Sequence, residues 1–456
     1  MNTTEVYKRL KSLMDASSGA EDDIQLAKIV EDMDMGAIDI LGSYYDLPIQ
    51  PIIGRLYYSE AEDVFLWHNG SEWFSKSQIP YTEIWTWGAA IGRPKLDEDP
   101  VTRSSPVSVI NTQMLDALKW TDLAMVSNDG LLLSSTGVLY GFGNNFGTVN
   151  LGSIEWEGND VSSPISISSF NDWKHISRNG GSSVCIREDG SLWTWGWGHS
   201  GSLGFYNESW SFNITKMRQP LGGFSDWVAS YGGSGSSAFA KRENGSLWTW
   251  GANGLGQLGD GTTISRSSPV SVIGGISDWT NIGVDQLGLS IFGTRADGSL
   301  WTWGFNTHGQ LGHNDIISKS SPVSVVGGIG NVVKASGGEL HALFLTDTGD
   351  IWSMGNDFDG PLGQGLRITR SSPVSVVGGF TDWIDIAAGH RVSFGLRQNG
   401  TLWSWGKNDF GQLGQGNLIS RSSPVSVLGG FTDWAMFPSK PAVSNRFAFF
   451  RIKNKE

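Results

Sequence analysis

The sequence predicts an all-β fold, a closed seven-bladed β-propeller of four-stranded blades, preceded by a small N-terminal helical segment and a β-hairpin module. Three markers that recur about every 52 residues favour this fold. Leu-Trp-Thr-Trp-Gly, or a close variant, begins at Ile84, Leu139, Leu192, Leu247, Leu300, Ile351 and Leu402. Asp-Trp, or a relative, places its aromatic ring at Trp120, Trp173, Trp227, Trp279, Trp383 and Trp434. Ser-Pro-Val-Ser-Val, or a variant, contains Pro106, Pro164, Pro269, Pro322, Pro373 and Pro424.

Each repeat contains four predicted strands. In Leu192–Gly196 tryptophan alternates with leucine and threonine, which is the period of two that strands require. Ser-Pro-Val-Ser-Val predicts a second strand, with proline at its start where a missing N–H is tolerated. The segment around Trp279 predicts a third strand, and the segment from Phe292 to an Asp-Gly hairpin turn predicts the fourth. We expect the repeated tryptophans to pack between blades. Basic residues that precede Ser-Ser-Pro are expected to form hydrogen bonds between blades: Arg103, Arg266, Lys319, Arg370 and Arg421.

The two ends of the repeat array predict closure of a ring. The array begins at 81–88 with only the strand that follows the Asp-Gly turn in the other repeats. It finishes with Trp434 and with 442–455, which correspond to the strands that precede this turn. The two end segments are therefore expected to complete one blade, which removes exposed sheet edges.

These units resemble the repeat of the regulator of chromosome condensation family over residues 81–456. The resemblance rests on Leu-Trp-x-Trp-Gly, Asn253-Gly-Leu-Gly-Gln-Leu-Gly259, Ser-Pro-Val-Ser-Val and Asp-Gly-Ser-Leu. It implies a seven-bladed propeller. The family's eukaryotic founder is a nucleotide-exchange factor that acts on a small GTPase through an inserted wedge and a basic histone-binding face. The present sequence has no comparable inserted hairpin and no basic face.

The first 80 residues predict an attachment region ahead of the propeller at 81–456. Residues 1–45 are expected to be helical, with helices at 4–17 and 20–34, and residues 46–80 to form a small β module. Alternating segments at 54–58, 63–67 and 72–74 predict three strands around an Asn-Gly turn. The sequence at 54–58 and 65–73 resembles short β modules in tail and other virion proteins of bacterial viruses, and the helical segment is similar to their attachment segments.

Composition and charge exclude several classes of protein. The chain has 62 Gly and 22 Trp among 456 residues, and so much aromatic surface excludes a disordered chain. With 32 basic and 45 acidic residues the net charge is −13, which argues against nucleic acid as a partner. The sequence has no run of 18 apolar residues and no signal-peptide pattern. We therefore expect that the protein does not insert into a membrane and that it is synthesised in the cytoplasm of a bacterial host.

No motif for catalysis, a cofactor or a metal stands out. The seven His show no zinc-ligand spacing, and the chain lacks the Gly-rich P-loop pattern. Asn356–Gly360 is similar to the start of a calcium loop, but it has no Glu at the twelfth position and lies in an ordinary blade turn. We therefore predict no catalytic, cofactor-binding or metal residues and no enzyme activity.

Aromatic residues outside the repeat pattern give the best candidate for an interaction face. Three adjacent repeats depart from the consensus in the loop after Leu-Trp-Thr-Trp-Gly. The candidate residues on these loops are Trp156, Trp197, Phe205, Tyr206, Trp210 and Phe212. They predict a face for protein docking or glycan binding. The alternative is sequence drift in loops that only avoid the N-terminal module.

The leading hypothesis from the sequence is a non-enzymatic structural protein of a bacteriophage virion, such as a tail or baseplate fibre, a host-binding adhesin or a surface decoration. Residues 1–80 would bind other virion proteins in an oligomeric assembly, and the rigid propeller would bind a host surface protein or glycan. The alternative is a cellular protein-binding scaffold or inhibitor. A guanine-nucleotide exchange factor ranks third.

Overall fold

The computed structural model describes isolated strands near the N-terminus and most of the repeat array. The described residues are 38–41, 56–59, 64–68, 73–75, 84–88, 103–110, 120–126, 129–143, 161–179, 181–205, 213–232, 235–325, 327–436 and 447–452. The chain divides into two compact units, one with residues 1–84, 110–119 and 452–456, the other with residues 85–109 and 120–451. The helices predicted at 4–17 and 20–34 and the boundaries predicted at 45 and 80 lie outside the described residues.

In the residues of the first unit that the structure describes, four strands form a sheet in the order β1-β2-β3-β4. Its strands are β1 (Ile38–Leu41), β2 (Leu56–Ser59), β3 (Val64–His68) and β4 (Trp73–Ser75). Strands β2, β3 and β4 pair antiparallel, as the sequence predicts, whereas β1 pairs parallel with β2. Strand β1 was not predicted, and it lies C-terminal to the two predicted helices within the segment 1–45. Its residues Ile38 and Ile40 are β-branched and favour an extended strand.

Within the described part of the second unit, six four-stranded sheets each consist of consecutive antiparallel strands. The first three blades are β7 (Trp120–Val126), β8 (Asp129–Ser134), β9 (Leu139–Gly143) and β10 (Val161–Ser166); β11 (Trp173–Asn179), β12 (Ser182–Arg187), β13 (Leu192–Trp197) and β14 (Asn213–Arg218); and β15 (Trp227–Gly232), β16 (Ser237–Arg242), β17 (Leu247–Gly251) and β18 (Arg266–Ser271). The next three are β19 (Trp279–Val284), β20 (Ser290–Arg295), β21 (Leu300–Gly304) and β22 (Lys319–Ser324); β23 (Val332–Gly337), β24 (His341–Thr346), β25 (Ile351–Gly355) and β26 (Arg370–Ser375); and β27 (Trp383–Ala388), β28 (Val392–Arg397), β29 (Leu402–Gly406) and β30 (Arg421–Ser426). One 3-10 turn, η4 (His199–Gly201), follows β13.

A further sheet combines the two ends of the repeat array in the order β31-β32-β5-β6. Its strands are β31 (Trp434–Ala435), β32 (Phe447–Ile452), β5 (Ile84–Gly88) and β6 (Arg103–Ile110). The C-terminal strand β32 is therefore the hydrogen-bonded neighbour of the first repeat strand β5, as the sequence predicts.

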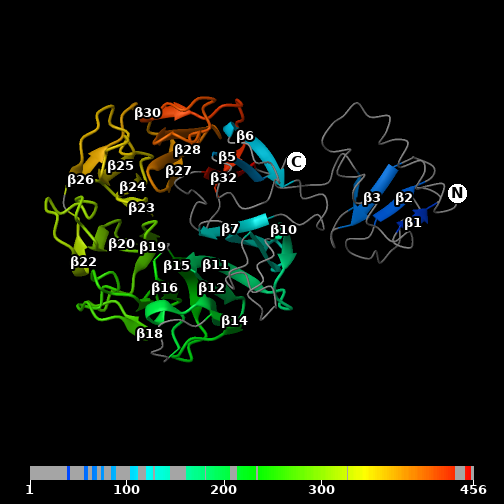
Figure 1. Ribbon diagram of the computed structural model, residues 1–456, viewed down its shortest axis with the longest axis horizontal. Helices are drawn as coiled ribbons and strands as arrows, with labels where there is room; N and C mark the ends of the chain where they lie inside the picture. Colours follow the sequence, from blue (N-terminus) through cyan, green and yellow to red (C-terminus); the bar gives the residue numbers. More distant parts are fainter. Residues whose placement is uncertain are drawn as a thin grey trace. The chain divides into compact units, whose positions relative to one another are not determined.

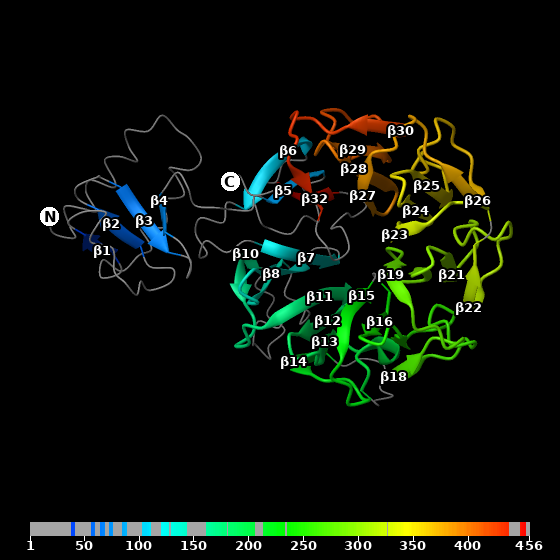
Figure 2. The same ribbon diagram turned by 180° about the vertical axis from the view of Figure 1, so that it is seen from behind.

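The blades of the second unit follow one another around a centre, with the Asp-Trp strands innermost (Figure 1). Successive innermost strands contact one another from β7 through β11, β15, β19 and β23 to β27. The Ser-Pro-Val-Ser strands β18, β22, β26 and β30 lie on the outer side, which the view from behind also shows (Figure 2). The architecture is thus an all-β propeller of four-stranded blades.

Tryptophan forms the core between blades. The tryptophan of each Asp-Trp pair, or of the related Lys-Trp pair, is the first residue of its strand and is at most 5% exposed: Trp120, Trp173, Trp227, Trp279, Trp383 and Trp434. The second tryptophan of the third strand is fully buried in four blades: Trp195, Trp250, Trp303 and Trp405. The first tryptophan of that strand, as at Trp248, is only half-buried, but it packs against the cluster of buried side chains between two blades.

In three blades a hydrogen bond connects the buried second tryptophan of the third strand to the preceding blade. The indole Nε1–H of Trp250 donates to the carbonyl oxygen of Ser202 at 2.9 Å, and that of Trp303 donates to Gln257 at 3.0 Å. The third-strand loops also bond to the outer strand of the following blade. The amide of Gly261 donates to the carbonyl oxygen of Ser320 at 2.9 Å. Neighbouring blades that make these bonds therefore satisfy some of each other's polar groups.

The sequence predicts that the basic residues before Ser-Ser-Pro bond between blades, but the side chains that the structure describes bond within their own loops instead. Arg266 pairs with Asp260 at 2.7 Å and Lys319 with Asp315 at 2.8 Å, each within the same loop. Each basic residue is the first residue of its strand, and its carboxylate partner lies only four to six residues earlier in the preceding turn, so the two side chains meet without crossing to another blade. The Arg103 side chain lies outside the described part of the chain.

Gly245 in the hairpin turn between β16 and β17 is predicted to be essential for packing. Its φ is +79°, and a Cβ there would overlap the carbonyl oxygen of Ser277 in the next blade. Gly223 has a similar φ of +63° but nothing within 4 Å of its Cβ position, so it is the matched control. Gly223→Ala should cost about 1 kcal/mol for its left-handed backbone, and Gly245→Ala roughly 2 kcal/mol more. Chemical denaturation of both variants measures the difference, and equal costs would contradict the proposed clash.

Candidate functional site

Two residues of the predicted aromatic face are described. Trp197 is half-buried at the end of β13, and its ring stacks on His199 with centroids 5.4 Å apart. Phe205 is half-buried in the turn after η4. The remaining members, Trp156, Tyr206, Trp210 and Phe212, lie outside the described residues. The aromatic face therefore stays a prediction.

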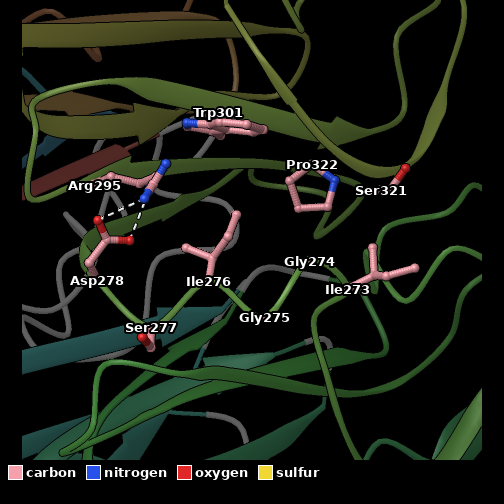
Figure 3. Close-up of a pocket in the computed structure, with 10 residues that line it drawn as sticks. All are labelled: Ile273, Gly274, Gly275, Ile276, Ser277, Asp278, Arg295, Trp301, Ser321 and Pro322. Carbon is pink, nitrogen blue, oxygen red and sulfur yellow. Dashed lines mark hydrogen bonds and ion pairs between the residues drawn. The ribbon is translucent and has the colours of Figure 1, made fainter.

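An open cleft of about 760 Å³ lies on the β19–β22 blade, a site that the sequence analysis did not find. The loop between β18 and β19 forms one wall, the ends of β20 and β21 form the second, and β22 completes it (Figure 3). The residues that line it are Ile273, Gly274, Gly275, Ile276, Ser277, Asp278, Arg295, Trp301, Ser321 and Pro322.

An ion pair orients the guanidinium group in this cleft. Nε and Nη2 of Arg295 donate to the two carboxylate oxygens of Asp278 at 2.8 and 2.9 Å (Figure 3). Hydrogen bonding to this carboxylate raises the pKa of Arg295. Asp278 contacts the edge of the Arg295 guanidinium group, which leaves the flat face of that group uncovered by the carboxylate. The ion pair as a whole has no net charge. Trp301 is fixed beside it, because its Nε1–H donates to Ser299 Oγ at 3.0 Å.

Three other blades contain the same Asp–Arg–Trp arrangement with a phenylalanine added. The phenyl rings of Phe170, Phe224 and Phe380 lie 4.0, 3.9 and 4.0 Å from the guanidinium carbons of the equivalent arginines. In the cleft the residue at this position is Ile276. The sequence signal was therefore present: an aligned repeat has isoleucine for phenylalanine while Asp278, Arg295 and Trp301 are retained.

The turn that is similar to a calcium loop holds a buried carboxylate. Asp357 is 0% exposed and accepts hydrogen bonds from the amides of Leu362 and Ile368 at 3.0 and 3.1 Å. Burial raises the pKa of Asp357 to about 6, against the opposing effect of these amides. The described residues contain no group of three His, Cys, Asp or Glu side chains arranged to hold a metal ion.

A buried Ser–His pair in the β24 and β28 strands has a structural role. Nε2 of His341 lies 3.0 Å from Ser393 Oγ, and this hydroxyl donates to the carbonyl oxygen of Pro361 at 2.8 Å. The hydroxyl proton thus points away from the imidazole, and both side chains are buried. Burial lowers the pKa of His341 to about 3. The geometry is that of a satisfied core pair rather than of an activated nucleophile.

No described helix has the length and apolar character needed to cross a bilayer. This finding concerns only the part of the chain that the structure describes.

Asp357 is predicted to make stability pH-dependent. Its folded pKa of about 6 exceeds the ordinary value of 3.8, so its stabilising contribution is full below pH 4 and is lost as pH rises through 6. Asp357→Asn has no charge to bury, although its one oxygen can accept from only one of the two amides, so the free energy of unfolding of the variant relative to the wild type should rise by roughly 1–3 kcal/mol between pH 4 and pH 7. Unfolding by denaturant at several pH values measures it.

The reciprocal control is Asn408→Asp. Asn408 occupies the equivalent buried position in the next blade, where its Nδ2 donates to the carbonyl oxygens of Asn417 and Ile419 at 2.9 and 3.2 Å. This variant should acquire a loss of stability at neutral pH. A pH-independent difference for Asp357→Asn would contradict the assignment.

The model of the Regulator of chromosome condensation (RCC1) repeat matches residues 244–282, 297–345 and 399–437, and a second RCC1 repeat model matches 383–412. Human E3 ubiquitin-protein ligase HERC2 is 28% identical over 312 residues, which is 66% of this chain but only 6% of HERC2. Ultraviolet-B receptor UVR8 of Arabidopsis thaliana is 24% identical over 358 residues, which is 75% of this chain and 77% of UVR8.

Solved structures share the fold. The crystal structure of Prp20p from Saccharomyces cerevisiae, described with its binding to Gsp1p and histones, superposes with a TM-score of 0.68 at 17% identity and covers 82% of this chain and 92% of Prp20p. The crystal structure of human WBSCR16 gives a TM-score of 0.66 at 22% identity over 82% of this chain and 99% of that chain. The chain therefore contains segments that match the RCC1 repeat, and it shares the β-propeller fold of these structures.

Proposed function

We propose that this chain is a non-enzymatic protein-binding scaffold, and that the β31-β32-β5-β6 sheet is the seventh blade that closes its propeller. A row of exposed isoleucines carries the proposal. Four isoleucines occupy the same position in four consecutive blades and are between 48 and 64% exposed: Ile264, Ile317, Ile368 and Ile419. Exposed apolar patches are a mark of protein interaction sites, and the repetition of one exposed residue type at one position suggests such a surface. We call these four residues the isoleucine row.

The loops that carry the row are held by the propeller framework. The amides of Gly261, Asn314 and Gly365 donate to the carbonyl oxygens of Ser320, Ser371 and Ser422 in the following blade. Side chains on such a fixed support can bind a partner with little loss of conformational entropy. The row therefore suits a protein-binding role.

Charge beside the row favours a partner with acidic groups at one end. The basic residues of the first two blades pair with carboxylates, Asp260 and Asp315. In the next two blades Arg370 and Arg421 have instead the neutral side-chain oxygens of Gln364 and Gln415 at 3.2 and 3.3 Å. These two arginines keep a net positive charge, in a chain whose overall charge is −13.

The other functions expected from the sequence have less support. The relatives named above give no support to a virion protein, and the virion location and virion partners of residues 1–80 stay predictions. The likeness to Prp20p shows a shared fold, and Gsp1p and histone binding is a property of that protein.

The scaffold function predicts that loss of the row removes partners. A triple variant, Ile317→Ser, Ile368→Ser and Ile419→Ser, should lose the proteins that co-purify with the wild type in stoichiometric amount after cross-linking in the cells that make it. The matched control is Leu221→Ser, Val377→Ser and Leu428→Ser, which removes exposed apolar side chains beyond the other end of the outer strands and should retain them. Quantitative mass spectrometry measures both; retention of every partner by the first variant would refute the role of the row.

A further inference from the structure

The β19–β22 cleft has the frame of an aromatic binding site without its ring. The guanidinium carbon of Arg295 lies 5.7 Å from the Trp301 ring centroid. The equivalent separations are 5.9 Å for Arg242 and Trp248 and 5.7 Å for Arg397 and Trp403. The arginine and the tryptophan are thus spaced in the same way whether or not a phenyl ring lies beside them.

In the complete blades the chain's own phenylalanine fills this frame. Phe380 lies 4.0 Å from the Arg397 guanidinium carbon, and its ring centroid is 5.0 Å from that of Trp403. Phe224 makes the corresponding contacts at 3.9 and 4.9 Å with Arg242 and Trp248. Cation–π and tilted ring contacts at these distances are favourable. The repeated geometry shows which chemical group the frame accepts.

Isoleucine leaves part of the frame open. Ile276 is half-buried and contributes to the floor of the cleft below Arg295 and Trp301, while Pro322 and Ile273 lie on its far side (Figure 3). It has no π system to place against the guanidinium face. The glycines Gly274 and Gly275 carry no side chains that would cover the entrance.

We propose that this cleft binds an aromatic side chain presented by a partner protein. The ring would lie against the guanidinium face of Arg295 and beside the indole of Trp301, as the built-in phenyl rings do in the other blades. The Asp278 carboxylate neutralises Arg295 and occupies its edge, so the site favours an uncharged ring over a carboxylate. The inference that the ring belongs to a partner protein rests on the proposed scaffold function. The inference that the cleft prefers an aromatic ring rests on the cleft alone.

The test uses N-acetyl-L-phenylalaninamide as the aromatic probe and N-acetyl-L-leucinamide as the apolar control. The full chain is labelled with 5-fluorotryptophan, and the ¹⁹F signal of Trp301 is assigned with Trp301→Phe. We expect a saturable shift of this signal in the millimolar range, with the leucine compound at least about fivefold weaker. Equal affinity for the two compounds, or no shift at Trp301, would overturn the proposal.

Two repeat-matched variants locate the binding. Ile276→Phe installs the residue found in the other blades and should weaken binding at Trp301 at least about tenfold. Phe380→Ile opens the same frame in the β27–β30 blade and should create a new phenylalaninamide-dependent shift at Trp403. Because the second variant tests a gain, poor folding of the first would not decide the outcome. Unchanged binding in Ile276→Phe, or no gain in a folded Phe380→Ile, would refute the site.

The result is separate from the test of the isoleucine row. A negative probe titration with partners still lost from the row variant refutes the cleft and leaves the scaffold function standing. If the probe binds the cleft but the row variant keeps every partner, the cleft is supported and the role of the isoleucine row is refuted.

Discussion

Burial of aromatic side chains between neighbouring blades is the constraint on which the propeller depends. Both faces of the third strand are covered, since in Leu247–Gly251 four of five residues are buried and only Trp248 is half-buried. A single blade would leave these faces in water. In the β23–β26 blade Met354 replaces the second tryptophan and is also fully buried, although it has no N–H to donate. Burial is therefore the constant requirement, and the hydrogen bond to the preceding blade is an addition to it.

Much of the architecture was predictable because the repeat shows each strand several times. The Asp-Trp tryptophans are the first residues of the innermost strands, and Leu-Trp-Thr-Trp-Gly coincides with the third strand in every regular blade. The pairing of β32 with β5 also followed from the incomplete repeats at the two ends. Such predictions succeed because they need only the order and spacing of strands, which the sequence carries directly.

Other features depend on depth and neighbours, which periodicity does not encode. Trp248 and Trp250 lie on the same face of their strand, yet Trp248 is half-buried and Trp250 is fully buried. Strand β1 was missed because a four-residue segment has too few residues to show a period. The cleft was missed because Ile276 for phenylalanine is a common apolar exchange, and its effect depends on the Arg295 guanidinium above it.

The contacts from each third-strand loop to the next outer strand are made by main-chain atoms, as between the amide of Gly365 and the carbonyl oxygen of Ser422. Such a junction is indifferent to which side chains the loop displays outward. The outward-facing residues of one blade can therefore change during evolution without a change in its main-chain contacts with the next blade. Because these contacts do not depend on side chains, a duplicated blade could pack beside either neighbour. One copy in such an array, the β19–β22 blade, could then acquire a different surface.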